Sequence, residues 1–99
     1  MEKLKNHYSL TDIQAQMITV PAMNLTGSAR EGIRLAGMAQ ADALAVVKRL
    51  HRCNFNKSMT THADHHDWQD VYHSEWNGIL LYIKFQREGD YFVVSFKEL

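Results

Sequence analysis

The sequence predicts an α+β fold, in which amino-terminal helices pack on one face of a mainly antiparallel sheet. Apolar residues recur at helical spacing up to about His51, and the spacing changes to two after Cys53. The chain has 99 residues, which is enough for one modest hydrophobic core and too few for two. We therefore expect a single domain over residues 1–99, with helices first and a meander of strands afterwards.

The first helix is expected to begin after Ser9, which can cap it with Asp12 at the third helical position. Its apolar stripe consists of Leu10, Ile13 and Met17. Pro21 should end this helix, because proline disrupts the helical hydrogen-bond ladder. Residues 24–26 are then expected to form a short edge strand.

Two further helices are predicted before the strands begin. One opens at the capping box Ser28 to Glu31 and stops at Gly37. The other runs from about Gln40 to His51. Its apolar face carries Ala43, Leu44, Val47 and Leu50.

The second half of the chain alternates apolar and polar side chains, as strands with one buried face do. The first predicted strand places Phe55, Lys57, Met59 and Thr61 on one side. The next runs from Trp68 to Trp76 and ends at the hairpin signal Asn77-Gly78. Two more strands flank the turn Gly89-Asp90. The helices should cover the apolar face of this sheet, and the open face then gathers Tyr82, Lys84, Gln86, Ser95 and Lys97.

The composition is 45% apolar and 22% charged, which is typical of a soluble globular protein and argues against disorder. The sequence contains no apolar run of the roughly 20 residues that cross a bilayer, and its first residues do not resemble a signal peptide. Cys53 is the single cysteine, which fits a reducing compartment, so we expect a cytoplasmic protein. The formal net charge is zero, so any anion-binding site must be local.

Four residues of the polar face could form a site for phosphate chemistry. Lys57, Gln69, Tyr82 and Lys97 each come from a different predicted strand. Two ammonium groups can stabilise the charge of a pentacoordinate phosphorane, and a phenol can transfer a proton beside it. The alternative is that these lysines only solubilise an exposed face, which is the commoner outcome for such a pattern.

The segment from His62 to Asp67 contains three histidines and two aspartates, which is a composition found in metal sites. A solvated loop between two strands is the simpler interpretation, because neither a cysteine pair nor a helical H-x-x-x-H spacing accompanies it. No metal ligand or other cofactor is therefore predicted. His73 shares the strand parity of Gln69, and a histidine there could donate or accept a proton.

Aromatic residues of the strands could stack single-stranded bases or belong to the core. Trp68 and Tyr72 lie opposite Gln69 by parity, so we assign them to packing. Tyr82 and Tyr91 have the parity of the open face and remain candidates for stacking.

Several ordered motifs of the second half resemble a known family of bacterial toxins. They are Phe55-x-Lys57-Ser58-Met59-Thr60-Thr61, Asp64-His65, Trp68-Gln69-Asp70-Val71-Tyr72 and Val94-Ser95-Phe96-Lys97-Glu98. In this order they are similar to the motility quorum-sensing regulator (MqsR) toxins, which have a RelE-like fold. The resemblance covers roughly the last 45 residues in detail and the first half only in outline.

The resemblance implies a type II toxin that acts as a sequence-specific, ribosome-independent and metal-independent mRNA endonuclease cutting at GC-containing sites. By motif, it places the catalytic residues on Lys57, Gln69, Tyr82 and Lys97, the quartet that strand parity assembles. We also expect RNA contacts from His73, Lys84 and His62. The implied partner is a zinc-containing helix-turn-helix antitoxin, and DNA would be bound through the complex with it.

The chain departs from the resemblance in charge, because better-known members of the family are basic and this chain is neutral. His73 and His62 stand where a basic residue and a tyrosine are common. Two alternative hypotheses remain. One is a catalytically inactive RNA- or protein-binding module on the same fold, and the other is a metal-dependent hydrolase that uses the histidine cluster.

Overall fold

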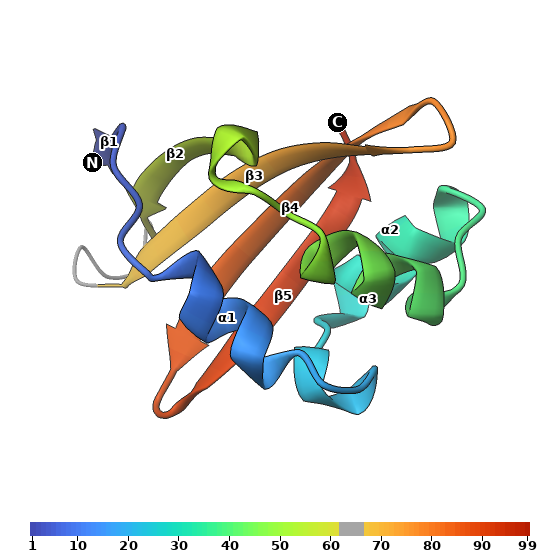
Figure 1. The fold of residues 1–99 in the computed structure, drawn as a ribbon, viewed down its shortest axis with the longest axis horizontal. Helices are drawn as coiled ribbons and strands as arrows, with labels where there is room; N and C mark the ends of the chain where they lie inside the picture. Colours follow the sequence, from blue (N-terminus) through green and yellow to red (C-terminus); the bar gives the residue numbers. More distant parts are fainter. Residues whose placement is uncertain (62–66) are drawn as a thin grey trace.

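The computed structural model describes residues 1–61 and 67–99, and the predicted α+β fold is confirmed. The helices are α1 (Leu10–Gln16), α2 (Gly27–Leu35) and α3 (Gln40–Lys48), with 3₁₀ turns at Pro21–Met23 and Arg52–Asn54. The strands are β1 (Glu2–Lys3), β2 (Phe55–Thr60), β3 (Trp68–Trp76), β4 (Ile79–Glu88) and β5 (Tyr91–Glu98). They form one antiparallel sheet in the order β1-β2-β3-β4-β5 (Figure 1).

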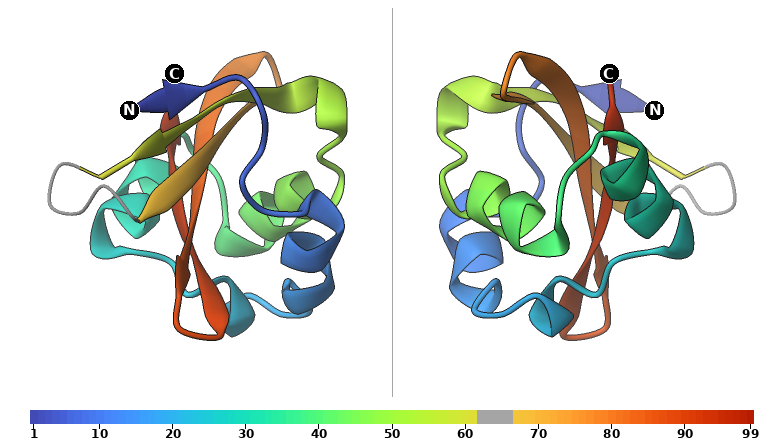
Figure 2. Two further views of the ribbon diagram at one scale, coloured as in Figure 1. Left: turned by 90° about the vertical axis from the view of Figure 1, so that its left-hand side faces the viewer. Right: turned by 90° about the vertical axis from the view of Figure 1, so that its right-hand side faces the viewer.

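One face of the sheet is buried beneath helices and the other is left open. Figure 2 views the strands nearly edge-on and shows α1 and α3 together on one side. The buried side chains of the last two strands are Leu81, Ile83, Phe85, Phe92, Val94 and Phe96, as the alternation predicts. α2 runs beside β5, the last strand of the sheet. Among the helices of residues 1–61 and 67–99, none combines the length and the hydrophobicity of a membrane-spanning segment.

The first helix begins as predicted and ends earlier. The Ser9 hydroxyl accepts a hydrogen bond from the Asp12 amide at 3.3 Å, so Ser9 is the cap. The helix stops at Gln16, however, and Pro21 opens a 3₁₀ turn instead of ending α1. Proline is favoured at such a first position because its missing amide hydrogen would have no partner there.

The second helix is capped by a different residue from the one predicted. The Thr26 hydroxyl accepts from the Ala29 amide at 3.0 Å, and Ser28 lies inside the first turn, so the predicted Ser28–Glu31 capping box is wrong. Gly37 ends the helix as expected, with a left-handed φ of 75°. The edge strand expected at residues 24–26 is reduced to a single parallel bridge between Leu25 and Val94.

The third helix ends at Lys48, before the predicted His51, and a tertiary contact explains the difference. The Gln14 amide nitrogen of α1 donates to the carbonyl oxygens of Val47, Lys48 and Leu50 at 2.9–3.2 Å. The last carbonyl groups of a helix need such partners. A side chain from another helix therefore supplies the cap that local sequence does not show.

A β-bulge in β2 alters the predicted parity of this strand. Phe55 pairs with Tyr72 and Lys57 pairs with Val71, so two residues of β2 span one step of β3. Phe55 consequently packs on the core side, with its ring centroid 5.5 Å from that of Tyr72. Placing Phe55 on the same side as Lys57 is therefore wrong, and the bulge is the reason.

Candidate active site

Cross-strand pairing arranges six of the predicted site residues on the open face. Tyr82 of β4 lies between its partners His73 of β3 and Lys97 of β5. In the next row Lys84 pairs with Val71, which in turn pairs with Lys57. Side chains of directly paired residues lie side by side on one face of a sheet. Gln69 lies in a third row. We define the open-face site as the polar residues of these three rows: Lys57, Gln69, His73, Tyr82, Lys84 and Lys97.

Tyr82 stands at the centre of this site. The Lys97 ammonium lies 5.1 Å from the centroid of the Tyr82 ring, and the His73 ring centroid lies at 5.9 Å. Burial raises the pKa of Tyr82, and the positive charge of Lys57 lowers it by less. The phenol therefore keeps its proton near neutral pH, so it can donate a hydrogen bond or a proton.

Lys57 is engaged by a residue that sequence reasoning missed. Its ammonium donates to a carboxylate oxygen (Oε2) of Glu2, on β1, at 2.8 Å. This hydrogen bond raises the pKa of Lys57 and lowers that of Glu2, so both groups are charged. Glu2 reaches the site because β1 pairs with β2. The sequence pattern does not predict this pairing, because β1 is only two residues long and distant in the chain from β2.

Lys84 adds a third ammonium group to the same surface. It is half-buried, and burial followed by the charge of Lys97 lowers its pKa. Its neighbour Val71 has no exposed surface although it lies on the open face. Lysine stems commonly cover apolar surface while their charged ends reach solvent. The open face thus carries three ammonium groups, those of Lys57, Lys84 and Lys97, which suits binding of a phosphate.

Gln69 lies one row away from the lysine pair, at the rim of the site. It pairs with Gln86 and Met59 across the sheet. Its amide nitrogen donates to Gln86 at 2.8 Å, and Gln86 donates to Glu88 at 2.9 Å. The structure therefore places Lys57, Tyr82 and Lys97 on one face of the sheet, with Gln69 at the rim. The catalytic roles of all four residues stay a prediction, and His62 lies outside the described residues.

A buried carboxylate fixes the amino-terminal arm, which we define as residues 1–8. Asp70 of β3 has no exposed surface. It accepts hydrogen bonds from the amides of His7 and Tyr8 at 2.8–3.0 Å and from the Ser58 hydroxyl at 2.6 Å. A buried charge is tolerated when it is hydrogen-bonded in this way. This role of Asp70 was not predicted from the sequence. An aspartate at a core-facing strand position was the feature that could have indicated it.

Trp68 provides a second attachment for the arm. The Lys3 ammonium lies 4.1 Å from the centroid of the Trp68 ring, and the His7 ring stacks on it at 5.3 Å. The assignment of Tyr72 to packing is confirmed, since it is buried in the core. Trp68 is half-buried and packs against the arm instead.

Within residues 1–61 and 67–99, no three histidine, cysteine, aspartate or glutamate residues gather as metal ligands would. Most of the histidine cluster predicted as an alternative metal site, residues 62–66, lies outside this part of the chain.

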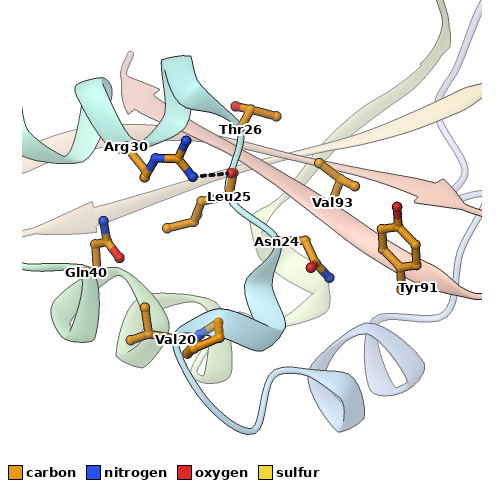
Figure 3. A pocket seen from close by; sticks show the side chains of 9 residues that line it. Val20, Asn24, Leu25, Thr26, Arg30, Gln40, Tyr91 and Val93 are labelled. Atoms are coloured by element: carbon orange, nitrogen blue, oxygen red, sulfur yellow. Dashed lines mark hydrogen bonds between the residues drawn. The ribbon is translucent and has the colours of Figure 1, made fainter.

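A separate hollow lies where the chain before α2 meets β5 (Figure 3). Among the described residues lining it, Arg30 is the one charged side chain, and it donates to the Leu25 carbonyl oxygen at 3.0 Å. Tyr91, a stacking candidate, lines this hollow rather than the site around Tyr82. With its cation used to hold the backbone, the hollow offers less for an anionic ligand than the open-face site.

Comparisons with known proteins identify the family of this chain. Residues 5–98 match the family described as motility quorum-sensing regulator, toxin of MqsA. The chain is also 33% identical over 98 residues to the mRNA interferase toxin MqsR of Escherichia coli (strain K12), and the match covers 99% of each chain. The protein therefore belongs to the family of motility quorum-sensing regulator toxins.

Proposed function

We propose that this protein is the toxin of a type II toxin–antitoxin pair and cleaves mRNA as an endoribonuclease. One observation carries the proposal: Lys57, Tyr82 and Lys97 lie on the same uncovered sheet face, with the Lys97 ammonium 5.1 Å from the Tyr82 ring centroid. Similarity to an mRNA interferase toxin along the whole chain supports it.

The proposed reaction uses the RNA itself as nucleophile. The 2′-hydroxyl attacks the adjacent phosphorus and expels the 5′-oxygen, which leaves a 2′,3′-cyclic phosphate and a 5′-hydroxyl. Lys57 and Lys97 stabilise the negative charge that grows on the phosphorane oxygens, because fixed cations at such positions lower the barrier. Tyr82 donates a proton, and Gln69 at the rim holds the phosphate or a flanking base.

The proposed function also specifies the substrate and the reaction conditions. The enzyme acts on single-stranded mRNA at GC-containing sites, without a ribosome and without a metal ion. Lys84 and His73 contact the RNA beside the reacting phosphate, since local cations supply much of the affinity for nucleic acid. His62 is proposed as a further contact on the basis of its sequence position.

The partner is proposed to be a zinc-containing helix-turn-helix antitoxin, which would carry the DNA-binding activity of the complex. The toxin meets both its partner and its substrate in the cytoplasm. A test is co-purification of the two proteins followed by operator binding, in which the toxin alone should not bind DNA.

The decisive experiment is cleavage of a defined single-stranded RNA by the purified protein in excess EDTA, without ribosomes. Lys57→Ala should lower the cleavage rate by about 10²–10³. Lys48→Ala is the matched control, because Lys48 is an exposed lysine on α3 away from the open-face site.

Fragments with 2′,3′-cyclic phosphate ends, lost in Lys57→Ala and kept in Lys48→Ala, would support the proposal and identify the cleavage site. A folded protein that binds RNA without cleaving it, with or without metal, would identify a binding module instead. Cleavage that requires added zinc or magnesium would contradict the metal-free mechanism.

A further inference from the structure

We propose that Glu2 is the general base of this ribonuclease and accepts the proton of the attacking 2′-hydroxyl. The inference rests on the proposed endoribonuclease function and adds to it a catalytic residue on the amino-terminal arm. It adds to the proposed quartet a carboxylate that contacts Lys57 directly.

The reaction requires a group that can take a proton near neutral pH. The Lys57 ammonium and the Tyr82 phenol both hold their protons, since the pKa of each is raised in the folded protein. Gln69 is not a base. A carboxylate remains deprotonated under these conditions and can serve as a general base when it is placed at the reacting hydroxyl.

Glu2 has such a position. Its Oε2 atom accepts the Lys57 hydrogen bond at 2.8 Å, and its side chain is 60% exposed, so the carboxylate remains accessible to a substrate. Its negative charge also raises the pKa of Tyr82, so the two groups interact electrostatically. When Lys57 binds an oxygen of the scissile phosphate, the neighbouring 2′-hydroxyl comes next to the same carboxylate.

The arm that carries Glu2 is anchored more strongly than a chain terminus usually is. Glu2 pairs with Met59 in the sheet, and the carbonyl oxygen of Met1 accepts from the Thr60 amide at 2.9 Å. The buried Asp70 and the stacked Trp68 hold the other end of the arm. Termini without such attachments are mostly poorly ordered. The anchoring therefore gives the carboxylate a fixed position, which general-base catalysis needs.

The proposed cleavage step conserves protons. The bond between the 2′-oxygen and phosphorus forms as the 2′-hydroxyl proton passes to the Glu2 carboxylate. The bond between phosphorus and the 5′-oxygen breaks as that oxygen takes a proton from Tyr82. Proton exchange with solvent then restores the Glu2 carboxylate and the Tyr82 phenol for the next cycle.

A competing role for Glu2 predicts the opposite effect. If its carboxylate only occupied the place of the phosphate on Lys57, removing its charge would tighten RNA binding and speed cleavage. If it only oriented Lys57, any replacement that restored Lys57 would suffice, whatever its basicity. The experiment is chosen to separate these roles.

The test compares single-turnover cleavage with binding of an RNA that carries a 2′-deoxy group at the cut site and cannot react. Any affinity tag is placed at the carboxyl end, away from Glu2. In Glu2→Gln we expect cleavage to slow by about 10²–10⁴, as for loss of a general base, with binding of the deoxy RNA retained. Glu75→Gln is the matched control, because Glu75 is an exposed carboxylate on β3 with the same parity as His73.

Added carboxylates give a second readout through Glu2→Ala. Formate and acetate should restore part of the cleavage rate, and acetate should restore more because it is the stronger base. Neither should restore Lys57→Ala. Such a dependence on basicity is expected of a proton acceptor and not of a group that only orients Lys57.

Unchanged or faster cleavage by Glu2→Gln would overturn the inference, as would loss of cleavage in His73→Gln while Glu2→Gln keeps the full rate. In either case the unsubstituted protein still cleaves, so the proposed function stands. If the unsubstituted protein itself fails to cleave, the proposed function fails and this inference fails with it.

Discussion

Replacing the buried carboxylate of Asp70 with an amide, Asp70→Asn, should loosen the amino-terminal arm. Three donors converge on this carboxylate: the amides of His7 and Tyr8 and the hydroxyl of Ser58. Asparagine offers one carbonyl oxygen and a nitrogen that donates, so at least one of these donors loses its acceptor. The side chain has no exposed surface, and water cannot readily take the place of the lost partner.

The expected loss of stability follows from these contacts. A hydrogen bond to a charged group contributes about 1.5–3 kcal/mol, and one between neutral groups about 0.5–1.5 kcal/mol. Exchanging the first kind for the second at two donors and losing the bond of the third lowers the free energy of unfolding by at least about 3 kcal/mol. That is a large part of the roughly 5–15 kcal/mol of a small domain, and it corresponds to a fall in Tm of roughly 12–24 °C.

The assay is urea unfolding followed by tryptophan fluorescence, combined with hydrogen exchange of the arm amides in native buffer. Exchange of residues 2–8 should accelerate more than exchange of β4, because the arm is the element that the carboxylate ties down. Asp90→Asn is the control, since Asp90 is exposed in the β4–β5 turn and asparagine suits turns equally well.

A free energy of unfolding within about 0.5 kcal/mol of the unsubstituted protein, which is the range of ordinary surface substitutions, would refute the reasoning if arm exchange were also unchanged. The arm would then be held by its strand pairing and by Trp68, without help from Asp70.

Three further predictions concern the packing of α2 on β5, the RNA-binding role of Lys84 and the amino-terminal arm. Gly32→Ala should destabilise the protein by about 1–3 kcal/mol and reduce cleavage, because an added Cβ would overlap the Phe96 carbonyl oxygen and lie 3.0 Å from the Lys97 Cα. Gly27→Ala is its control, having no atom within 4 Å of the added Cβ, and equal effects of the two changes in thermal unfolding would count against the prediction. Lys84→Ala should weaken RNA binding and reduce the slope of the logarithm of the binding constant against log salt by about 0.7, the value for one phosphate contact with a single strand. An unchanged slope in a salt titration would show that Lys84 does not contact the RNA. Burial, followed by the charge of Lys3, lowers the pKa of His7, so the folded state disfavours the imidazolium and stability is lost as the pH falls below the usual histidine range. His7→Gln should therefore lose less stability than the unsubstituted protein between neutral pH and about pH 5 in urea unfolding, and an identical loss would contradict the assignment.

Helix ends were the part of the fold that local sequence predicted least well. The Ser9 cap and the Gly37 stop followed from local chemistry and are confirmed. Thr26 caps α2 instead of Ser28. Both residue types are favoured at this position, so the sequence pattern does not distinguish between them. The early end of α3 depends on Gln14, a side chain on another helix.

The site was predictable in part because strand parity is a local property. Alternation in β4 and β5 places Tyr82, Lys84 and Lys97 on one face whatever the rest of the molecule does. Lys57 also reached this face, although the bulge at the start of β2 moved Phe55 to the other side. Asp70 was not recognised because its partners are amides more than 60 residues away in the chain.

Local sequence was enough to predict the class of fold, the buried and open faces of β4 and β5, and the motifs that the family shares. These follow from side-chain periodicity and from residue order, which need no knowledge of distant contacts. Three features follow only from contacts between distant segments: the amino-terminal arm pairs with β2, Asp70 holds it there, and Glu2 binds Lys57. Those contacts join the first eight residues to strand positions 55 to 63 residues further along the chain, and only the assembled sheet brings them within hydrogen-bonding distance.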